Sequence, residues 1–325
     1  MNTKQEKDLT FPNFDDIKVS TKTFTAMTNL SIKLKELFEN LPITEYIVVP
    51  KKRGRKKKSE VSDPNKDIPP GSIISIDFEG ETRGVKIKPK KLKTGKKKKW
   101  FRNSMTVEIM FDKRINFKIC RNGTFQMTGC KTHDHAELCV KYIWEYIKDK
   151  TDMYTFTRDK QFQVLFIPSM RNIDFSLGFL VDREKLNKYM CSQDEFHCLL
   201  ETSFGYTGVN IKIPLENDIS TMKIKKLTYR KNKWVSVWTT YQEYLNILQP
   251  KDRDSKLKDE RYNTFLVFHS GNVIMSGLTA DFMRNVYYYF LKIIKNAYNK
   301  IEERLDNNLE LSLEDELFLA ELENI

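Results

Sequence analysis

A stretch of sixteen residues occurs twice in this chain, and this repetition constrains the fold more than any other feature. Residues 114–129 align without gaps to residues 262–277, at an offset of 148 residues. Both copies read as a β-hairpin, with Asn122-Gly123 and Gly271-Asn272 at the turn, because Asn and Gly readily adopt positive φ angles. A repeat at matched positions predicts two copies of one folding unit.

The segments before the hairpins repeat in the same order. Residues 80–88 resemble residues 205–212, and Lys99-Trp100 resembles Lys233-Trp234. Further upstream, residues 21–41 and 170–190 both read as a strand followed by an amphipathic helix. We therefore interpret the chain as two copies of a unit of about 130 to 150 residues.

Helices are expected at two places in each unit. The first helix of copy one has apolar residues at helical spacing over residues 30–41, with Thr28 or Asn29 as its N-cap. In copy two, Asp182 is the expected cap of a helix that starts at Arg183. Apolar stripes over residues 136–147 and 282–297 predict a longer closing helix in each copy. Strand, helix, antiparallel strands and closing helix, twice over, predict an α+β fold.

Composition narrows the class of protein. The chain has 325 residues, 56 Lys and Arg against 44 Asp and Glu, and 40% hydrophobic residues, which exclude wholesale disorder. It has neither an apolar N-terminal leader nor a run of roughly 18 apolar residues, so no membrane span or secretion is expected. Five cysteines without a CxxC pair indicate a reducing compartment. The net charge of +12 favours a polyanionic partner, most often nucleic acid.

The charge is unevenly distributed along the chain. Basic runs occupy residues 51–58 and 96–99. Residues 301–325 hold nine acidic residues and one basic residue, which leaves a net charge of +20 on the rest of the chain. We expect a flexible N-terminus over residues 1–16 and an acidic C-terminal tail over residues 299–325.

At the hairpins the residues resemble the TATA-box-binding protein family. Each repeat of that family has a hairpin of the form aliphatic-Phe-x-Ser-Gly-x-aliphatic-aliphatic-Thr-Gly, followed by Ala-Lys and a long helix. Residues 266–277 match this form closely, with Ser276 for Thr, and residues 119–131 match it in part. Residues 170–173, Met-Arg-Asn-Ile, are similar to the Gln-Asn signature of the family's first strand.

The chain is identified on these motifs as a divergent member, of the kind found in large DNA viruses. The resemblance implies two pseudo-symmetric repeats, residues 17–150 and 151–298, that form a saddle with a curved antiparallel sheet and helices on its convex face. It is interrupted by insertions at about residues 43–72, 88–100 and 214–260.

The resemblance also implies which residues contact DNA. The family's concave sheet docks on the minor groove, where Phe side chains wedge between base steps and bend the duplex. Phe268 matches the wedge of the second-repeat hairpin, and Phe204 matches its partner on the preceding strand. Phe78 is taken as the first-repeat counterpart, whereas the hairpin wedge position there holds Cys120, a side chain too small to separate stacked bases. Further DNA-binding positions are matched by Asn172, Thr128, Ser276 and Lys131.

The function implied is that of a DNA-binding general transcription-initiation factor that binds and bends AT-rich promoter DNA. It is not an enzyme and needs neither a cofactor nor a metal. The expected partners are double-stranded DNA, a factor IIB-like transcription factor and RNA polymerase, with the protein monomeric on DNA. The expected location is the nucleus or a cytoplasmic viral factory.

Three other interpretations remain open. A protein of the same fold could bind nucleic acid or protein partners without recognising TATA sequences. Asp77 and Glu79 resemble the first metal-binding motif of DnaQ-like exonucleases, but the later His or Tyr spacing to an Asp is absent. Cys130, His133 and His135 lack the further ligands of a zinc site, and both histidines are expected to be surface residues at a helix N-terminus.

Overall fold

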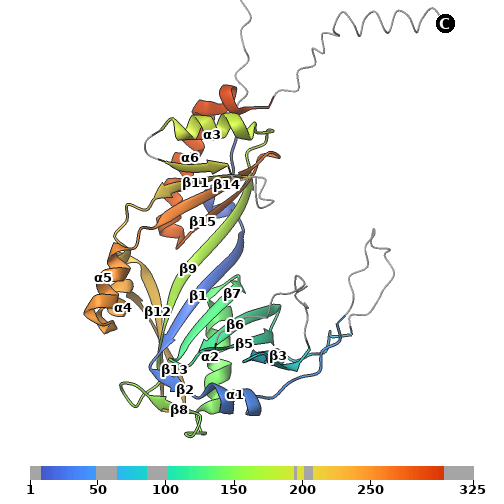
Figure 1. Ribbon diagram of the computed structural model, residues 1–325, viewed down its shortest axis with the longest axis vertical. Coiled ribbons are helices and arrows are strands. Elements are labelled where there is room, and N and C mark those ends of the chain that lie inside the picture. The colour runs from blue at the N-terminus through green and yellow to red at the C-terminus, as the bar shows by residue number, and fades with distance from the viewer. Residues whose placement is uncertain (1–8, 49–63, 86–101, 194–195, 201–207, 304–325) are drawn as a thin grey trace, which may run out of the picture.

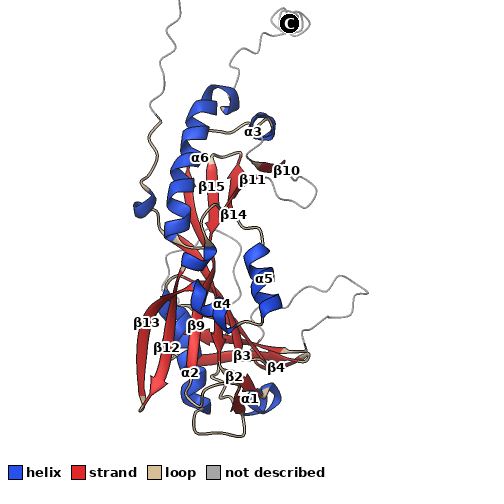
Figure 2. Cartoon of the chain, turned by 90° about the vertical axis from the view of Figure 1, so that its left-hand side faces the viewer, coloured by secondary structure: helices blue, strands red, loops and turns tan. Residues whose placement is uncertain are grey.

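A computed structural model describes residues 9–48, 64–85, 102–193, 196–200 and 208–303, and contains one large antiparallel sheet with helices (Figures 1 and 2). In chain order its elements are η1 (Phe14–Asp16), β1 (Val19–Thr28), β2 (Leu30–Ile32), α1 (Leu34–Asn40), β3 (Ser72–Phe78), β4 (Glu81–Gly84), β5 (Ser104–Met110), β6 (Arg114–Cys120), β7 (Thr124–Cys130), α2 (His133–Ile147), β8 (Tyr154–Phe156), β9 (Gln163–Ser176), α3 (Arg183–Cys191), β10 (His197–Leu200), β11 (Gly208–Pro214), η2 (Ile219–Thr221), β12 (Lys223–Arg230), β13 (Lys233–Thr240), α4 (Tyr241–Ile247), α5 (Pro250–Lys258), β14 (Tyr262–Phe268), β15 (Asn272–Gly277) and α6 (Ala280–Ile301). The α+β class predicted from the sequence is confirmed.

The sheet has two halves with the same strand order on either side of β1 and β9. From the centre outward, the first half runs β1, β7, β6, β5, β3, and the second runs β9, β15, β14, β11, β10. The hairpins also share their register. Asn116 pairs with Thr128 in one and Thr264 pairs with Ser276 in the other, at the same offset of 148 residues. The sequence repeat is therefore matched by a repeat in strand pairing.

Both hairpin turns need glycine because they pack against backbone. Gly123 and Gly271 have φ angles of +74° and +78°. A Cβ atom at Gly123 would lie 2.2 Å from the carbonyl oxygen of Leu30, and one at Gly271 would lie 2.1 Å from that of Phe179. Such approaches exclude any side chain, so the same residue type is required at equivalent places in both halves.

Helices α2 and α6 lie on one side of the sheet (Figure 2), and each covers the core of its own half. Alternate residues of the strands point toward them, as period-2 patterning requires. Phe117 of β6 and Phe265 of β14 are fully buried in the two cores. Burial of each such ring contributes roughly 1.5–3 kcal/mol relative to exposure. The remaining alternate residues of each strand point to the opposite side of the sheet, which we call the open face.

Strand β9 belongs to both halves of the sheet. Even-numbered residues of its first part and odd-numbered residues of its second part point toward the helices. Its pairing with β1 shifts register where Thr23 and Phe24 lie opposite Met170 and Pro168. Before the shift, Phe166 belongs to the first-half core, and after it Ile173 belongs to the second-half core. The bulge lets one continuous strand serve both cores.

The insertion between β11 and β14 is folded and packs against both sides of the sheet. Its hairpin β12–β13 extends the sheet beside the first part of β9. On the open face, Leu165 and Ile167 of β9 are covered by Tyr244 and Leu245 of α4. Figures 1 and 2 show α4 close to β9, and α5 follows α4 along the chain. The insertion therefore limits the open face at its centre.

Three sequence-based expectations differ from the structure. The first helix begins at Leu34, not after Thr28 or Asn29, because residues 30–32 pair with β8 as a strand. Residues 12–16, expected to be flexible, pack on α6: Phe14 is fully buried and Tyr287 donates a 2.6 Å hydrogen bond to the carbonyl oxygen of Pro12. The buried residue Ile301 belongs to α6, so the predicted tail boundary at 299 falls inside a helix.

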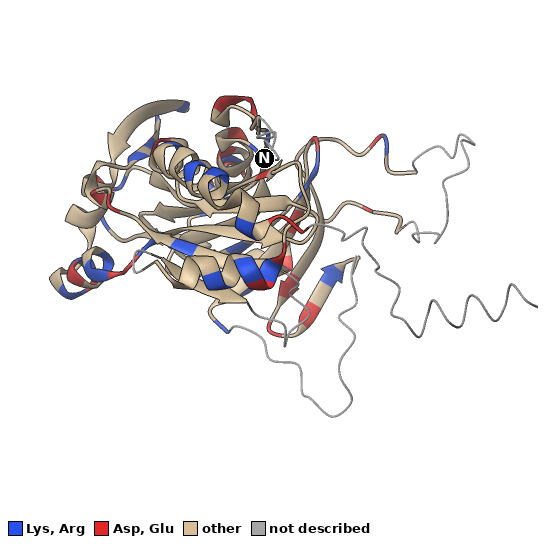
Figure 3. Ribbon diagram, turned by 90° about the horizontal axis from the view of Figure 1, so that it is seen from above, with Lys and Arg blue, Asp and Glu red and all other residues tan. Residues whose placement is uncertain are grey.

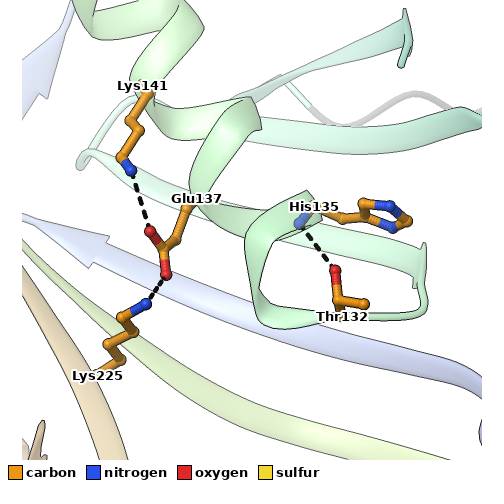
Figure 4. Close-up of polar contacts among 5 residues, drawn as sticks. All are labelled: Thr132, His135, Glu137, Lys141 and Lys225. Atoms are coloured by element: carbon orange, nitrogen blue, oxygen red, sulfur yellow. Dashed lines mark hydrogen bonds and ion pairs between the residues drawn. The ribbon is translucent and has the colours of Figure 1, made fainter. Parts of the chain in front are cut away.

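A buried carboxylate ties the inserted hairpin to α2. Glu137 is 5% exposed and accepts hydrogen bonds from Lys141, at 3.1 Å, and from Lys225 of β12 (Figure 4). Burial raises the pKa of Glu137, but the two lysines lower it by more, so the net pKa lies below its ordinary value. The charged form of Glu137 is thus stabilised in the folded protein.

Replacing Glu137 with Ala should destabilise the protein by about 2 kcal/mol, because Lys225 would lose its partner while it remains largely buried. Urea unfolding at pH 7 measures this. The control is Glu39→Ala, whose carboxylate is exposed and lies 4.0 Å from Lys35, and whose effect should stay within about 0.5 kcal/mol. Equal effects of the two substitutions would contradict the assignment.

Candidate nucleic-acid interface

Outside the part of β9 that α4 covers, the open face carries many uncharged polar residues. Cross-strand partners point to the same side of a sheet, so the strand register identifies its members. On the described central and inner strands its polar members include Thr21, Thr23, Thr25, Asn172, Asp174, Ser176, Asn272, Ser276, Thr264, Thr124, Gln126, Thr128, Asn116, Lys118 and Cys120. Its apolar members include Met27, Leu165, Ile167, Met170, Ile274, Leu266 and Phe268. Hydroxyl and amide groups therefore gather where β1 pairs with the second part of β9, beyond the residues that α4 covers.

A row of four paired residues crosses the centre of the open face. Thr264 pairs with Ser276, Ser276 with Asn172, and Asn172 with Thr21. Two of the predicted site residues, Ser276 and Asn172, are thus direct neighbours. The side-chain oxygen Oδ1 of Asn172 is buried and has no hydrogen-bond partner among the described residues. Asn172 is half-buried and lies at the middle of the face, between Thr21 and Ser276.

Phe268 ends β14 at the outer end of the second half. It pairs with Gly208, is half-buried, and lines a cavity of about 770 Å³ together with Asp174 and Ile274. The turn beside it is held in place because His269 contacts the carboxylate of Glu303, just after α6. An aromatic ring is therefore presented at one end of the open face on a supported hairpin.

The equivalent position in the first half holds Cys120, as the repeat predicts. Cys120 pairs with Ser104 and lines a cavity of about 790 Å³. Thr128 lies on the same face, exposed, and its hydroxyl donates to the carbonyl oxygen of Asn116 at 3.3 Å. Thr128 and Ser276 thus occupy matched places in the two halves.

Phe78 does not lie on the open face. It is 7% exposed and its ring packs 5.8 Å from that of Phe38 in the first-half core. The structure corrects its pairing with Phe204, because Ser104 of β5, not Gly84 of β4, occupies the place equivalent to Gly208. Within the described residues, β4 is therefore not the counterpart of β11.

Two predicted DNA-binding residues, Phe204 and Lys131, remain to be placed. Phe204 lies outside the described residues, as do both basic runs. Lys131 follows β7 and is exposed, and its backbone N–H donates to Nδ1 of His135 at 3.2 Å. Lys99 and Trp100 also lie outside the described residues, whereas Lys233 and Trp234 belong to β13 of the inserted hairpin.

Two further polar residues of the open face were not predicted from the sequence. Asn210 of β11 pairs with Leu266, and its buried Oδ1 has no hydrogen-bond partner among the described residues. Thr23 of β1 lies opposite Met170, at the centre of the face. The alternation of apolar and polar residues over 208–214 would have indicated Asn210, but no pattern indicates Thr23 because its position depends on the β1–β9 register.

Charged residues do not form a single stripe on the described part of the molecule. Figure 3 shows Lys, Arg, Asp and Glu spread over helices, strands and loops. Lys22 points toward the helices, where burial lowers its pKa. The central row of Thr21, Asn172, Ser276 and Thr264 contains no charged residue.

The residues weighed for catalysis or metal binding take structural roles. Asp77 accepts a hydrogen bond from Thr82, and Glu79 occupies the tight β3–β4 turn with a φ of 46°. His135, expected at the surface, is buried and contacts Asp112 at 2.9 Å. Within the described ranges, no three His, Cys, Asp or Glu residues are placed to hold a metal ion, and no helix is long and apolar enough to span a membrane.

His133 was also expected at the surface but is partly buried. Its ring centroid lies 4.7 Å from that of Phe24 and 5.4 Å from that of Trp238 on the inserted hairpin. Burial, followed by the charges of Lys22 and Lys225, lowers the pKa of His133 to about 4. This histidine is therefore neutral at physiological pH.

Comparison with known proteins gives two relatives from large DNA viruses. The chain is 26% identical over 299 residues to the uncharacterized protein 335L of Invertebrate iridescent virus 6, covering 88% of this chain and 86% of that protein. It is 25% identical over 198 residues to the TATA-box-binding protein-like protein of Acanthamoeba polyphaga mimivirus, covering 58% of this chain and 45% of that protein. No family model matches the chain.

Among solved structures, Methanococcus jannaschii TBP aligns with a TM-score of 0.42 and 13% sequence identity, over 88% of this chain and 99% of that chain. The sequence relatives confirm the resemblance inferred from the hairpin motifs. The chain is a divergent relative of TATA-box-binding-protein-like proteins of large DNA viruses.

The partly buried His133 should make the free energy of unfolding depend on pH. Its folded-state pKa lies below the unfolded value of about 6.5, so the unfolded state binds a proton first, and stability falls as pH decreases from about 6.5 to about 4. Urea midpoints at pH 7 and pH 5 should differ less in His133→Phe than in the unmodified protein. The control, His197→Phe at an exposed position, should keep the original difference; identical pH profiles for all three proteins would refute the assignment.

Proposed function

We propose that this divergent relative of viral TATA-box-binding-protein-like proteins is a non-enzymatic transcription-initiation factor that binds and bends AT-rich promoter DNA. In this proposal the sheet sits on the duplex as a saddle, with the open face against the minor groove. The observation that carries it is the central row of Thr264, Ser276 and Asn172 with Phe268 at the end of the same face.

The chemistry of the face suits the minor groove. A·T and T·A pairs present only acceptors there, so hydroxyl and amide donors can contact both without distinguishing them. Asn172 and Ser276 supply such donors at the centre of the face. A sheet enters the narrow groove only if the groove is opened, and an apolar ring inserted between base steps opens it. Among the described residues, Phe268 presents an aromatic ring at the end of the open face and would supply this wedge.

The proposed role includes partners. The protein would act as a monomer on DNA, because its two repeats already supply two related halves. A factor IIB-like protein and RNA polymerase would join it on the promoter, in a nucleus or a cytoplasmic viral factory. The name of the mimivirus relative supports this assignment to transcription.

Selection of bound sequences from a random duplex pool tests the function directly. We expect an AT-rich consensus, and the selected duplex should bend when bound, as measured by energy transfer between dyes at its two ends. If no sequence is enriched, or if the enriched duplexes have no AT bias and do not bend, the alternative function is favoured. In that alternative the protein binds other nucleic acids or proteins without recognising TATA sequences.

Phe268→Ala should weaken binding to the selected duplex by about 1–3 kcal/mol and reduce its bend, because the loss removes an aromatic contact with the bases. The matched control is Leu138→Ala, an exposed apolar residue of α2 on the opposite side of the sheet. Affinity by fluorescence anisotropy and bending by energy transfer are measured for both. If Phe268→Ala bends DNA as fully as the parent, the wedge assignment is wrong.

A further inference from the structure

The two ends of the open face differ in chemistry although the repeat places them at equivalent positions. Phe268 ends β14 and lies opposite Gly208, whereas Cys120 ends β6 and lies opposite Ser104. Each lines a cavity of similar volume, about 770 Å³ beside Phe268 and about 790 Å³ beside Cys120. The two cavities are therefore matched sites whose side chains can be compared directly.

The cavity beside Cys120 is positively charged. Its lining includes three cationic side chains and several amides, namely Arg102, Lys118, Arg121, Asn103, Asn122 and Gln126, and none of the residues that line it is acidic. The cavity beside Phe268 contains the carboxylate of Asp174, and no Lys or Arg is among its described lining residues. The cavity linings at the two ends of the open face therefore differ in charge.

The basic end is built on a fixed backbone. The amide of Arg121 donates to the carbonyl oxygen of Asn103 at 3.1 Å, and the carbonyl oxygen of Arg121 accepts from Ile32 at 2.8 Å. The β6–β7 turn is thus held from two sides while the Arg121 side chain is exposed. Burial raises the pKa of Cys120, so the neutral thiol adds no negative charge. Arg and amide donors held in this way are well suited to phosphate oxygens.

We infer that the first-half hairpin end binds backbone phosphates of the duplex, and that of the two equivalent hairpin positions Phe268, and not Cys120, unstacks a base step. This inference rests on the proposed function. Cys120 cannot reach between base pairs, and phosphate contacts position a protein without reading or separating bases. A flexible step such as TA lowers the cost of unstacking, whereas an A-tract is stiff. The DNA site therefore needs a flexible base step, such as TA, at the end where Phe268 inserts.

Duplexes that carry 2-aminopurine at either end of the selected site test this asymmetry. Its fluorescence rises when the base is unstacked, so the unmodified protein should raise the signal at one end and Phe268→Ala should abolish the rise. A duplex with TA steps at both ends should bind within about twofold of a duplex with one TA step. A rise at both ends with the unmodified protein would overturn the inference.

Charge variants test the phosphate contacts. Arg102→Gln with Arg121→Gln should lower the slope of log Kd against log salt by about 2, since each phosphate contact contributes about 0.9. The bend of the bound duplex should stay unchanged. The matched control, Lys292→Gln with Lys295→Gln on exposed positions of α6, removes the same charge from the opposite side and should leave the slope nearly unchanged.

Cys120→Phe is the gain-of-function variant. It should add a second unstacked base step, seen as a new 2-aminopurine signal at the first-half end and a larger bend.

Equal salt slopes for the Arg102–Arg121 variant and the α6 control would contradict the phosphate site while leaving the proposed function intact. If the unmodified protein binds no duplex, the proposed function fails, and this inference fails with it.

Discussion

The backbone pairing of β1 with β9 is the interaction on which the rest of the structure depends. It joins the two halves into one sheet, and its register decides which residues of both strands reach the open face. A shift of one residue would turn Asn172 toward the helices and Ile173 toward solvent. The bulge opposite Thr23 and Phe24 is what lets β9 keep its apolar residues in both cores.

The inserted segment between β11 and β14 gives this molecule a feature that the repeat does not supply. Its hairpin is fastened to α2 by Glu137 and Lys225 and by the contact of Trp238 with His133. Its helix α4 covers Leu165 and Ile167 on the open face. The continuous apolar run at the start of β9 is explained by this coverage, because that part of the strand is buried on both faces.

The pseudo-symmetry of the backbone does not extend to the chemistry of the open face. Matched positions hold Thr128 and Ser276, which are equivalent, but also Cys120 and Phe268, which are not. A duplicated fold therefore supplies two similar supports, and the side chains at the ends differ in size and charge. In the proposed complex with DNA, the two ends would therefore differ in the sequence-dependent cost of deforming the duplex beneath them.

The sequence by itself determined the repeat, the two hairpins with their glycines and the closing helices. These features depend on local periodicity and on turns that only certain residues can form, and both can be read along the chain. The tertiary structure alone decided that Phe78 is buried, that β5 and not β4 corresponds to β11, and that residues 30–32 form a strand. Each of these outcomes depends on which distant strand supplies the pairing partner, and hydrogen bonds between strands are not encoded in the spacing of residues within one strand.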